Sequence, residues 1–364
     1  MRCWRRRPIL PPLPAPGRVE PVRLSAFVPN RNYGRFVGGC IEAILAQSRP
    51  ADEIHLVDDA STDDSARVMA AYAARDPARI RFAARTQNRG VVRLMNDSLA
   101  MSDCECHVMC ASDDRVIPGF FKRAMTLMEA YPTAGFCSGL IRMIDQDGRD
   151  IGPANAPVPF DRACFIPPEE AKRLLLRIDS WFAGGATVFR RTALQEIGGF
   201  DEELRSLCDG FASRVLAMRH GVCFVPYPVM AWRPGRGSLS ATINSNAEVM
   251  LEVLARATGL MRGRHADAVP EAYVRAFERR IRFMIGSAVV LENAARQSDG
   301  IERLMGAGRA FGLGALIGVS STLARVLLFL RYRSGEIPAT IARLVRQERY
   351  RRRWPAGRFV AEEP

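Results

Sequence analysis

The sequence predicts an α/β protein with a doubly wound, mostly parallel sheet flanked by helices, followed by a helical C-terminal extension. Short apolar runs alternate with amphipathic stretches from residue 24 to residue 130, a pattern typical of such a sheet. A cluster of polar residues follows each of the apolar runs. Beyond Ser245 the composition changes to segments rich in Ala, Arg and Leu, which favours helices.

Each element of the first half follows from local patterning. Four apolar runs are expected to form strands, at 24–29, 53–59, 80–85 and 105–112. Apolar residues at helical spacing predict helices over 36–47, 61–75, 90–100 and 118–130. The second of these helices opens with a Ser/Thr-x-x-Asp pattern, which is a helix-capping signal.

The second half continues in the same way. Residues 133–152 predict a strand and a hairpin with Asp147 and Gly148 at its turn. We expect a strand over 184–190, a helix over 209–220 and a strand over 222–226. The chain should therefore divide into a basic, Pro-rich leader (1–21), an α/β domain (22–245) and a helical, Arg-rich region (246–364). The leader lacks the apolar core of a signal peptide, so we interpret it as disordered or as an upstream start-site artefact.

Charge and cysteine content narrow the class of protein. The net charge is +13, and all but two of the 52 basic residues are arginines. Arginine matches phosphate geometry, which fits anionic substrates and anionic membrane surfaces, although a coding bias toward arginine explains the excess equally well. The tail lacks interleaved aromatic residues apart from Tyr332, Tyr350 and Trp354, so we expect no nucleic-acid partner. Nine cysteines without a metal-binding spacing indicate buried free thiols and a cytoplasmic location.

The polar clusters mark a ligand site. They follow the predicted strands at Pro29–Tyr33, Asp58–Asp59, Asn88–Gly90 and Asp113–Asp114. In doubly wound sheets, ligands bind outside the carboxyl ends of the strands. Asp58 and Asp59 could accept hydrogen bonds from a base or ribose, or only cap the strand end. Asp113 and Asp114 could hold a divalent cation, or only form a turn. Neither a Walker phosphate loop nor a GxGxxG fingerprint is present.

Four segments carry a resemblance to a known family. They are LSAFVPNRNYGRFVGGCIEAILAQSRPADEIHLVDDASTDDS (24–65), NRGVVRLMN (88–96), ASDDRVIPGF (111–120) and GGATVFRRTALQEIGGFDEEL (184–204). Together they resemble the family 2 glycosyltransferases over about 220 residues. The resemblance implies a GT-A fold and inverting transfer from a nucleoside-diphosphate sugar to an acceptor hydroxyl. The acceptor would be a glycan or a lipid-linked glycan, in cell-surface or exopolysaccharide synthesis.

The resemblance also implies residue roles on the donor side. Pro29 and Asp58 would line the nucleotide base, with Tyr33 and Asn88 nearby. Asp113, helped by Asp114, would hold Mn²⁺ or Mg²⁺. Arg233 would lie near the diphosphate. A cation and an arginine together would neutralise the charge that develops on the leaving group.

On the acceptor side, Asp209 would be the general base, which typically contributes ~10²–10⁴-fold to such a reaction. Gly184, Gly185 and Asp201 would lie in the acceptor segment. Three departures from the family pattern stand out: Ala111 replaces the first acid of Asp-x-Asp, Cys208 precedes Asp209 where an acid is common, and Gly235 replaces a histidine. A non-catalytic nucleotide-binding protein and a nucleotidyltransferase therefore stay open as alternatives.

The C-terminal region admits three interpretations. Residues 310–330 are largely apolar and contain a Gly314-x-x-x-Gly318 pair, and residues 331–353 hold eight arginines and two glutamates. The first interpretation is a packed helical subdomain or an oligomer contact, including a homo-oligomer. The second is a peripheral helix on an anionic membrane, at the inner face of the plasma membrane. The third is a membrane span, which Arg325 and the Ser320–Thr322 cluster disfavour.

Overall fold

The computed structural model describes residues 22–154, 157–182, 184–235, 246–291 and 321–333, together with residues 336, 348 and 351–353. Its strands are β1 (Leu24–Asn30), β2 (Glu53–Asp58), β3 (Ile80–Ala84), β4 (Cys106–Met109), β5 (Arg115–Val116), β6 (Phe136–Ile144), β7 (Asp150–Pro153), β8 (Cys164–Ile166), β9 (Thr187–Arg190) and β10 (Val222–Trp232). Its helices are α1 (Gly34–Leu45), α2 (Ser65–Arg75), α3 (Val91–Ala100), α4 (Phe120–Ala130), α5 (Pro168–Arg177), α6 (Arg191–Glu196), α7 (Cys208–His220), α9 (Ala247–Arg262), α10 (Glu271–Leu291) and α13 (Ser321–Arg333). Two 3₁₀ segments, η2 (Gly184–Ala186) and η3 (Glu202–Leu207), lie between them.

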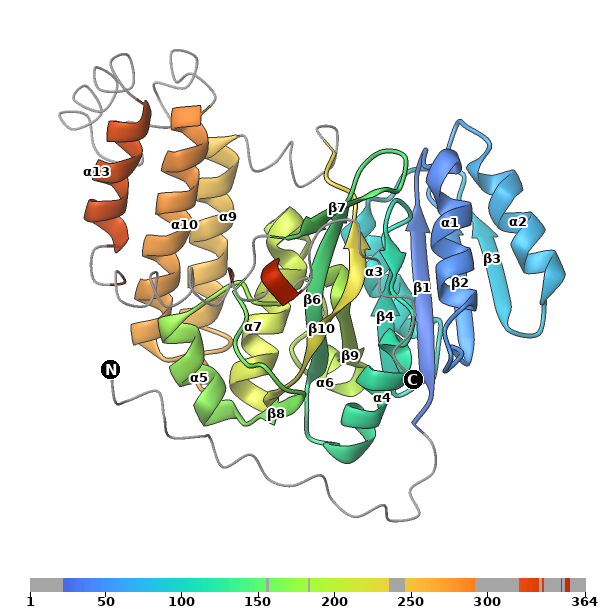
Figure 1. Cartoon of the computed structure of the whole chain (residues 1–364), viewed down its shortest axis with the longest axis horizontal. Coiled ribbons are helices and arrows are strands. Elements are labelled where there is room, and N and C mark those ends of the chain that lie inside the picture. Colours follow the sequence, from blue (N-terminus) through green and yellow to red (C-terminus); the bar gives the residue numbers. More distant parts are fainter. Residues whose placement is uncertain are drawn as a thin grey trace.

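The strands form one mixed sheet in the order β3-β2-β1-β4-β9-β6-β10-β5, with β7 beside β6 and β8 beside β10. Strands β1, β2, β3, β4, β6 and β10 run in one direction, and β9 runs against its neighbours β4 and β6. The fold class expected from the sequence is confirmed: a central sheet flanked by helices, with a helical C-terminal region. The helices α9, α10 and α13 stand side by side at the end of the molecule opposite to β3 and α2 (Figure 1).

Side chains of the central strands are buried on both faces because helices cover both. Along β1, Leu24, Ala26 and Val28 belong to one apolar cluster, and the intervening Phe27 belongs to another. This alternation is what the two-residue repeat of a strand requires. Helices α1 and α4 contribute to the first cluster, and α3, α5 and α7 contribute to the second. The second cluster also contains residues of α9, α10 and α13, so the C-terminal helices share a core with the sheet.

Local expectations were met with some differences. The hairpin turns where predicted, with Gly148 at φ +82° and its N–H donating to the Asp145 carbonyl. The helix predicted over 61–75 begins only at Ser65, so the capping interpretation of residues 61–64 was wrong. Ser61 instead donates its backbone N–H and its hydroxyl to Asp58, which holds the segment after β2 as a loop.

The structure also bears on the predictions about cysteine thiols and a membrane span. Eight cysteines (Cys40, Cys104, Cys106, Cys110, Cys137, Cys164, Cys208 and Cys223) are free and buried, as expected. Within the ranges described above, no helix is both long and apolar enough to span a membrane. The leader 1–21 and most of 310–330 lie outside the described residues. The domain boundary at residue 245 stays a prediction.

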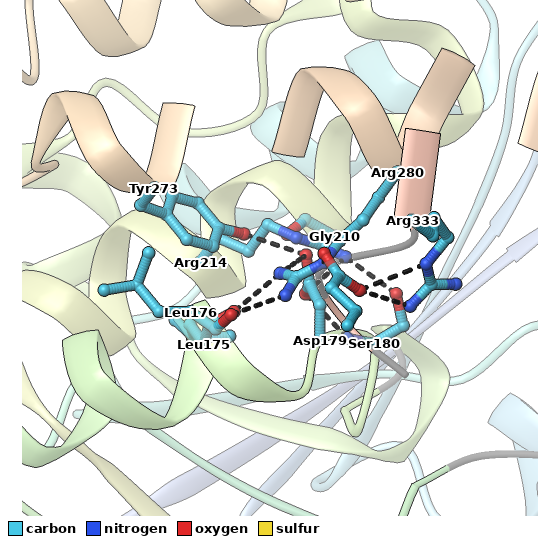
Figure 2. Close-up of polar contacts among 10 residues, drawn as sticks. Leu175, Leu176, Asp179, Ser180, Gly210, Arg214, Tyr273, Arg280 and Arg333 are labelled. Carbon is cyan, nitrogen blue, oxygen red and sulfur yellow. Dashed lines mark hydrogen bonds and ion pairs between the residues drawn. The ribbon is translucent and has the colours of Figure 1, made fainter. Parts of the chain in front are cut away.

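A buried carboxylate joins the C-terminal helices to the sheet domain. Asp179, just after α5, contacts Arg214 of α7 at 2.9 Å and Arg280 of α10 at 3.7 Å, and it accepts a hydrogen bond from the Tyr273 hydroxyl at 3.0 Å. Arg280 also donates to the carbonyls of Leu175 and Leu176 in the last turn of α5 (Figure 2). Burial alone would raise the pKa of Asp179, but Arg214 and Arg280 outweigh it and the pKa is lowered. Asp179 is therefore a buried anion held between two cations.

We expect Asp179→Asn to lower the free energy of unfolding by about 3–5 kcal/mol, because it leaves two buried guanidinium groups without their shared countercharge. The matched control is Asp147→Asn, since Asp147 pairs with Arg35 and Arg149 on the exposed hairpin and surface pairs contribute little. Urea denaturation followed by circular dichroism measures both. Equal stability of the two variants would contradict a structural role for Asp179.

Candidate functional site

The first group of predicted site residues meets where β1 and β2 end. The register of the two strands places Asn30 beside Asp58. Asp58 is buried, and its Oδ1 accepts from the Asn30 amide at 3.0 Å and from the Ser61 hydroxyl at 2.5 Å, while its Oδ2 accepts from the Ser61 N–H at 2.9 Å. Asp58 thus holds the loop after β2 against the end of β1. Because each carboxylate oxygen can accept two hydrogen bonds, Oδ2 retains one position for a ligand.

The neighbouring Asp59 fixes the loop that carries Asn88. Its carboxylate accepts from the backbone N–H groups of Arg89, at 2.9 and 3.1 Å, and of Gly90, at 3.0 Å. The exposed Asn88 side chain also accepts from the Gly90 N–H at 3.0 Å. Pro29 lies one position before Asn30, and its carbonyl accepts from the Ser112 hydroxyl at 2.6 Å. Pro29, Asp58 and Asn88 therefore belong to one region at the carboxyl ends of β1 to β3.

The acidic pair follows β4 and lies against Arg233, which comes directly after β10. The Asp114 side chain accepts from the Arg233 N–H at 2.8 Å, and the Asp113 carbonyl accepts from Arg233 Nε at 3.0 Å. Another guanidinium N–H of Arg233 donates to the Asp145 carbonyl of the hairpin, and the guanidinium lies 4.5 Å from the centre of the Phe36 ring. Arg233 is buried, so it also organises the loops on either side of it.

The two carboxylates of this pair are held in a setting that favours their neutral forms. Burial raises the pKa of Asp113. Burial and the charge of Asp113 raise the pKa of Asp114 to about 8. Burial raises the pKa of Tyr33 as well, and the charges of Asp113 and Asp114 add to this effect, which places the tyrosine hydroxyl near the pair. A bound cation would reverse this situation because it stabilises the ionised carboxylates.

Gly184 and Gly185 connect the acidic pair to Asp209. A Cβ atom on Gly185 would lie 2.7 Å from Met230 Sδ and 3.8 Å from Asp114 Oδ2. A Cβ atom on Gly184 would lie 1.7 Å from Asp209 Oδ2. Since consecutive Cα atoms are about 3.8 Å apart, the carboxylates of Asp114 and Asp209 are within about 12 Å of each other.

Asp209 lies in the first turn of α7, and its Oδ1 accepts from the Gly210 N–H at 2.6 Å. The side chain is half-buried. Burial raises the pKa of Asp209, and the positive charge of Arg214 acts in the opposite direction. A carboxylate at the start of a helix, with a raised pKa, is suited to accept a proton near neutral pH.

Asp201 lies apart from this constellation. Its Oδ1 accepts from the Glu203 N–H at 3.0 Å and so caps η3, and its Oδ2 pairs with Arg256 of α9 at 2.7 Å. An acceptor-side role for Asp201 stays a prediction. The structure brings together Tyr33, Asp113, Asp114, Gly184, Gly185, Arg233 and Asp209. Sequence reasoning missed the binding of Asn30 to Asp58, although an asparagine at a strand end was a visible signal.

No group of three or more His, Cys, Asp or Glu side chains that could hold a metal ion occurs among the residues with a described placement. Among the residues that the structure describes, Asp113 and Asp114 are the candidate protein ligands. Ala111 contributes only its carbonyl, which accepts from the Asp114 N–H at 3.0 Å. Nothing lies within 4 Å of the position a Cβ atom on Gly235 would take. Two neighbouring carboxylates fit a hard cation, which prefers oxygen ligands.

Comparison with known proteins identifies a family whose model matches part of the chain. Residues 25–198 match the family model described as Glycosyl transferase family 2. An uncharacterized glycosyltransferase of Haemophilus influenzae is 29% identical over 131 residues, which cover 36% of this chain and 48% of that protein. The glycosyltransferase GlyG of Streptococcus pneumoniae is 33% identical over 93 residues, 26% of this chain and 31% of that protein. The matched segment thus spans less than half of either relative.

Two solved structures share the fold over most of the chain. The mannosyltransferase PcManGT of Pyrobaculum calidifontis, in complex with GDP-Man and Mn²⁺, superposes with a TM-score of 0.51 at 20% identity, covering 91% of each chain. Residues 1–349 of TarS from S. aureus, in complex with UDP-GlcNAc, superpose with a TM-score of 0.52 at 16% identity, covering 86% of this chain and 92% of that one. At these identities the likeness shows the fold, which is GT-A. The family match over residues 25–198 and this fold agree with each other.

We expect Gly184→Ala to lower any transfer activity by ~10²-fold, because the new methyl group would displace the Asp209 carboxylate. The matched control is Gly259→Ala, since a Cβ atom there meets nothing within 4 Å. Initial rates at saturating donor and acceptor test the pair. Wild-type turnover in Gly184→Ala would show that the position of Asp209 does not matter.

Proposed function

We propose that this chain, whose residues 25–198 match the family 2 glycosyltransferase model, is an inverting hexosyltransferase that moves a sugar from a nucleoside-diphosphate donor to an acceptor hydroxyl. One observation carries the proposal: the Gly184–Gly185 segment separates an acidic pair backed by an arginine from the half-buried Asp209. The leaving diphosphate and the incoming hydroxyl need these two kinds of group on opposite sides of the anomeric carbon.

The donor would bind along the carboxyl ends of β1, β2 and β4. Asp58 has one free acceptor position for a base N–H, and Pro29, Tyr33 and Asn88 border the same edge. Asp113 and Asp114 are the residues that would hold Mn²⁺ or Mg²⁺. When bound, such an ion neutralises charge on the diphosphate leaving group. Arg233 adds a second positive charge, whose position is set by its bonds to the Asp113 and Asp145 carbonyls.

The acceptor would approach from the side of Asp209. Its carboxylate would take the proton of the acceptor hydroxyl as the oxygen attacks the anomeric carbon. A single base and one direct displacement give inversion at that carbon. A nucleotidyltransferase would use the acidic pair but leave Asp209 without a role, so the geometry favours glycosyl transfer. A non-catalytic nucleotide binder would retain the donor edge only.

The biological setting extends the proposal. A glycan or lipid-linked acceptor in surface or extracellular polysaccharide synthesis would suit an enzyme at the inner face of the plasma membrane. The exposed arginines at 351–353 agree with contact to anionic lipid, which attracts basic segments. A homo-oligomer also stays a prediction.

We expect Asp209→Asn to retain near-normal donor affinity and to lose transfer by ~10²-fold or more, because the amide keeps the size of the carboxyl but cannot take up a proton. Asp267→Asn is the control, since this exposed acid pairs with Arg219 of the same helix α7. Donor titration and steady-state turnover separate binding from catalysis. Full activity of Asp209→Asn would place the base elsewhere, and a wild type without activity on a broad substrate panel would favour the non-catalytic alternative.

We expect Asp113→Asn to abolish the part of nucleoside-diphosphate binding that depends on Mn²⁺, since it removes one of two candidate carboxylate ligands. Isothermal titration of UDP and GDP, with Mn²⁺ or with EDTA, measures this effect. The control is Asp103→Asn, another acid close to β4 but outside the acidic pair. Identical affinities with Mn²⁺ and with EDTA in the wild type would exclude a metal role in donor binding.

A further inference from the structure

A series of buried charged side chains extends from Arg214, near the proposed base, to Glu336, which follows α13. We call Arg214, Asp179, Arg280 and Glu336 the buried charge chain. Arg214 contacts Asp179, Asp179 contacts Arg280, and Arg280 Nε donates to Glu336 at 2.9 Å. Glu336 also binds Arg333 of α13 at 2.7 Å. The side chains of Arg214, Asp179 and Arg280 are 6–7% exposed, and that of Glu336 is 12% exposed.

One end of the buried charge chain touches the backbone that holds Asp209. Arg214 Nη1 donates to the Gly210 carbonyl at 2.7 Å, and the N–H of the same glycine donates to Asp209 Oδ1 at 2.6 Å. A Cβ atom on Gly210 would lie 2.9 Å from Arg214 Nη1, so a larger residue would crowd the guanidinium. The guanidinium also lies 5.4 Å from the centres of the Phe182 and Phe277 rings. Arg214 is therefore held in one place beside the base.

Stability alone is a weak reason to bury these groups. Replacing buried ion pairs by apolar residues of similar volume is often neutral or stabilising. Among the described residues, the two arginines and two carboxylates of the buried charge chain balance each other, and Arg333, which binds Glu336, adds one further positive charge. An ionised Asp209 supplies a third negative charge beside Arg214.

We propose that Arg214 is a positioning residue that holds Asp209 ready to accept a proton. Asp179, Arg280 and Glu336 connect this arginine to helices α10 and α13, so that the packing of these helices sets the rate of transfer. This inference rests on the proposed role of Asp209. It assigns to the C-terminal helices a part in catalysis without contact to either substrate.

The pKa of Asp209 depends on the charged and titratable groups that face it. On its own helix they are Arg214, whose charge lowers the pKa of Asp209, and the buried Cys208 thiol, whose pKa is raised well above its usual value by burial and by Asp209 itself. Across Gly184 and Gly185 lies Asp114. The charge of Asp201, which caps η3, also raises the pKa of Cys208. Removal of the Arg214 charge should therefore move the acidic limb of the rate profile to higher pH.

The test compares kcat between pH 5.5 and pH 9 (about the range set by the carboxyl groups) in full-length Arg214→Lys, Arg214→Met, Glu336→Gln and the control Glu348→Gln. Glu348 pairs with Arg352 on the surface, so the control makes the same chemical change in an exposed pair. Arg214→Lys keeps the positive charge but loses the forked guanidinium group. We therefore expect kcat to fall ~10-fold, while the acidic limb of the pH–rate profile stays at the same pH. Arg214→Met should lower kcat further and move the limb to higher pH. Glu336→Gln should lower kcat by about 3–10-fold, with donor KM unchanged.

Thermal denaturation and donor binding identify any variant that does not fold, and Arg214→Lys and Glu336→Gln keep the test informative if Arg214→Met is lost. The proposal is overturned if Arg214→Lys and Glu336→Gln turn over like Glu348→Gln, or if Arg214→Lys and Arg214→Met lose activity equally at each pH. Those outcomes leave Asp209 as the base. Full activity of Asp209→Asn would instead remove the proposed function on which this inference depends.

Discussion

The placement of Asp179 between Arg214 and Arg280 is the constraint on which the second half of the structure depends. Three helices far apart in sequence, α5, α7 and α10, must approach one carboxylate closely enough to bury it. A buried anion without partners is costly, so the helices have little freedom to slide relative to one another. Tyr273 and the last carbonyls of α5 complete the hydrogen bonding. The orientation of α7, and with it the position of Asp209, follows from this arrangement.

The donor half is organised by a different device, in which carboxylates bind backbone N–H groups. Asp58 holds the loop after β2, Asp59 holds the loop after β3, and Asp114 holds the residue after β10. Asp59 and Asp114 each join two segments that are far apart in the sequence. The site is therefore rigid where a nucleotide would bind. These hydrogen bonds also explain why aspartates lie at this edge even where their carboxylates are already bonded to backbone N–H groups.

Most of the sheet could be predicted from the sequence because its strands are short apolar runs followed by polar residues. Helix α5 was missed although Pro168, Glu169 and Glu170 in its first turn and Arg177 in its last are standard signals. The prediction that residues 61–64 begin a helix was wrong because the Ser61 hydroxyl donates to Asp58, a preceding residue that the capping pattern does not include. Asp209 and Arg233 were named through the family resemblance, whereas Asp113 was also indicated by its place after a predicted strand. Arg214 was not, because its partners Asp179 and Tyr273 lie 35 and 59 residues away and no periodicity links them to it.

The reversed strand β9 has a consequence for how the chain folds. It has four residues, and it is the link between β4 and β6, which have no direct pairing with each other in the sheet order. Its partner Cys106 precedes it by more than eighty positions, paired with Arg190, so this contact closes late compared with the local pairing of β1 with β2. Until β9 docks, β4 and β6 both expose unpaired edges, which are templates for association with other chains. The interval before residues 187–190 emerge during synthesis is thus a stage at which the edges of β4 and β6 are open to association with other chains.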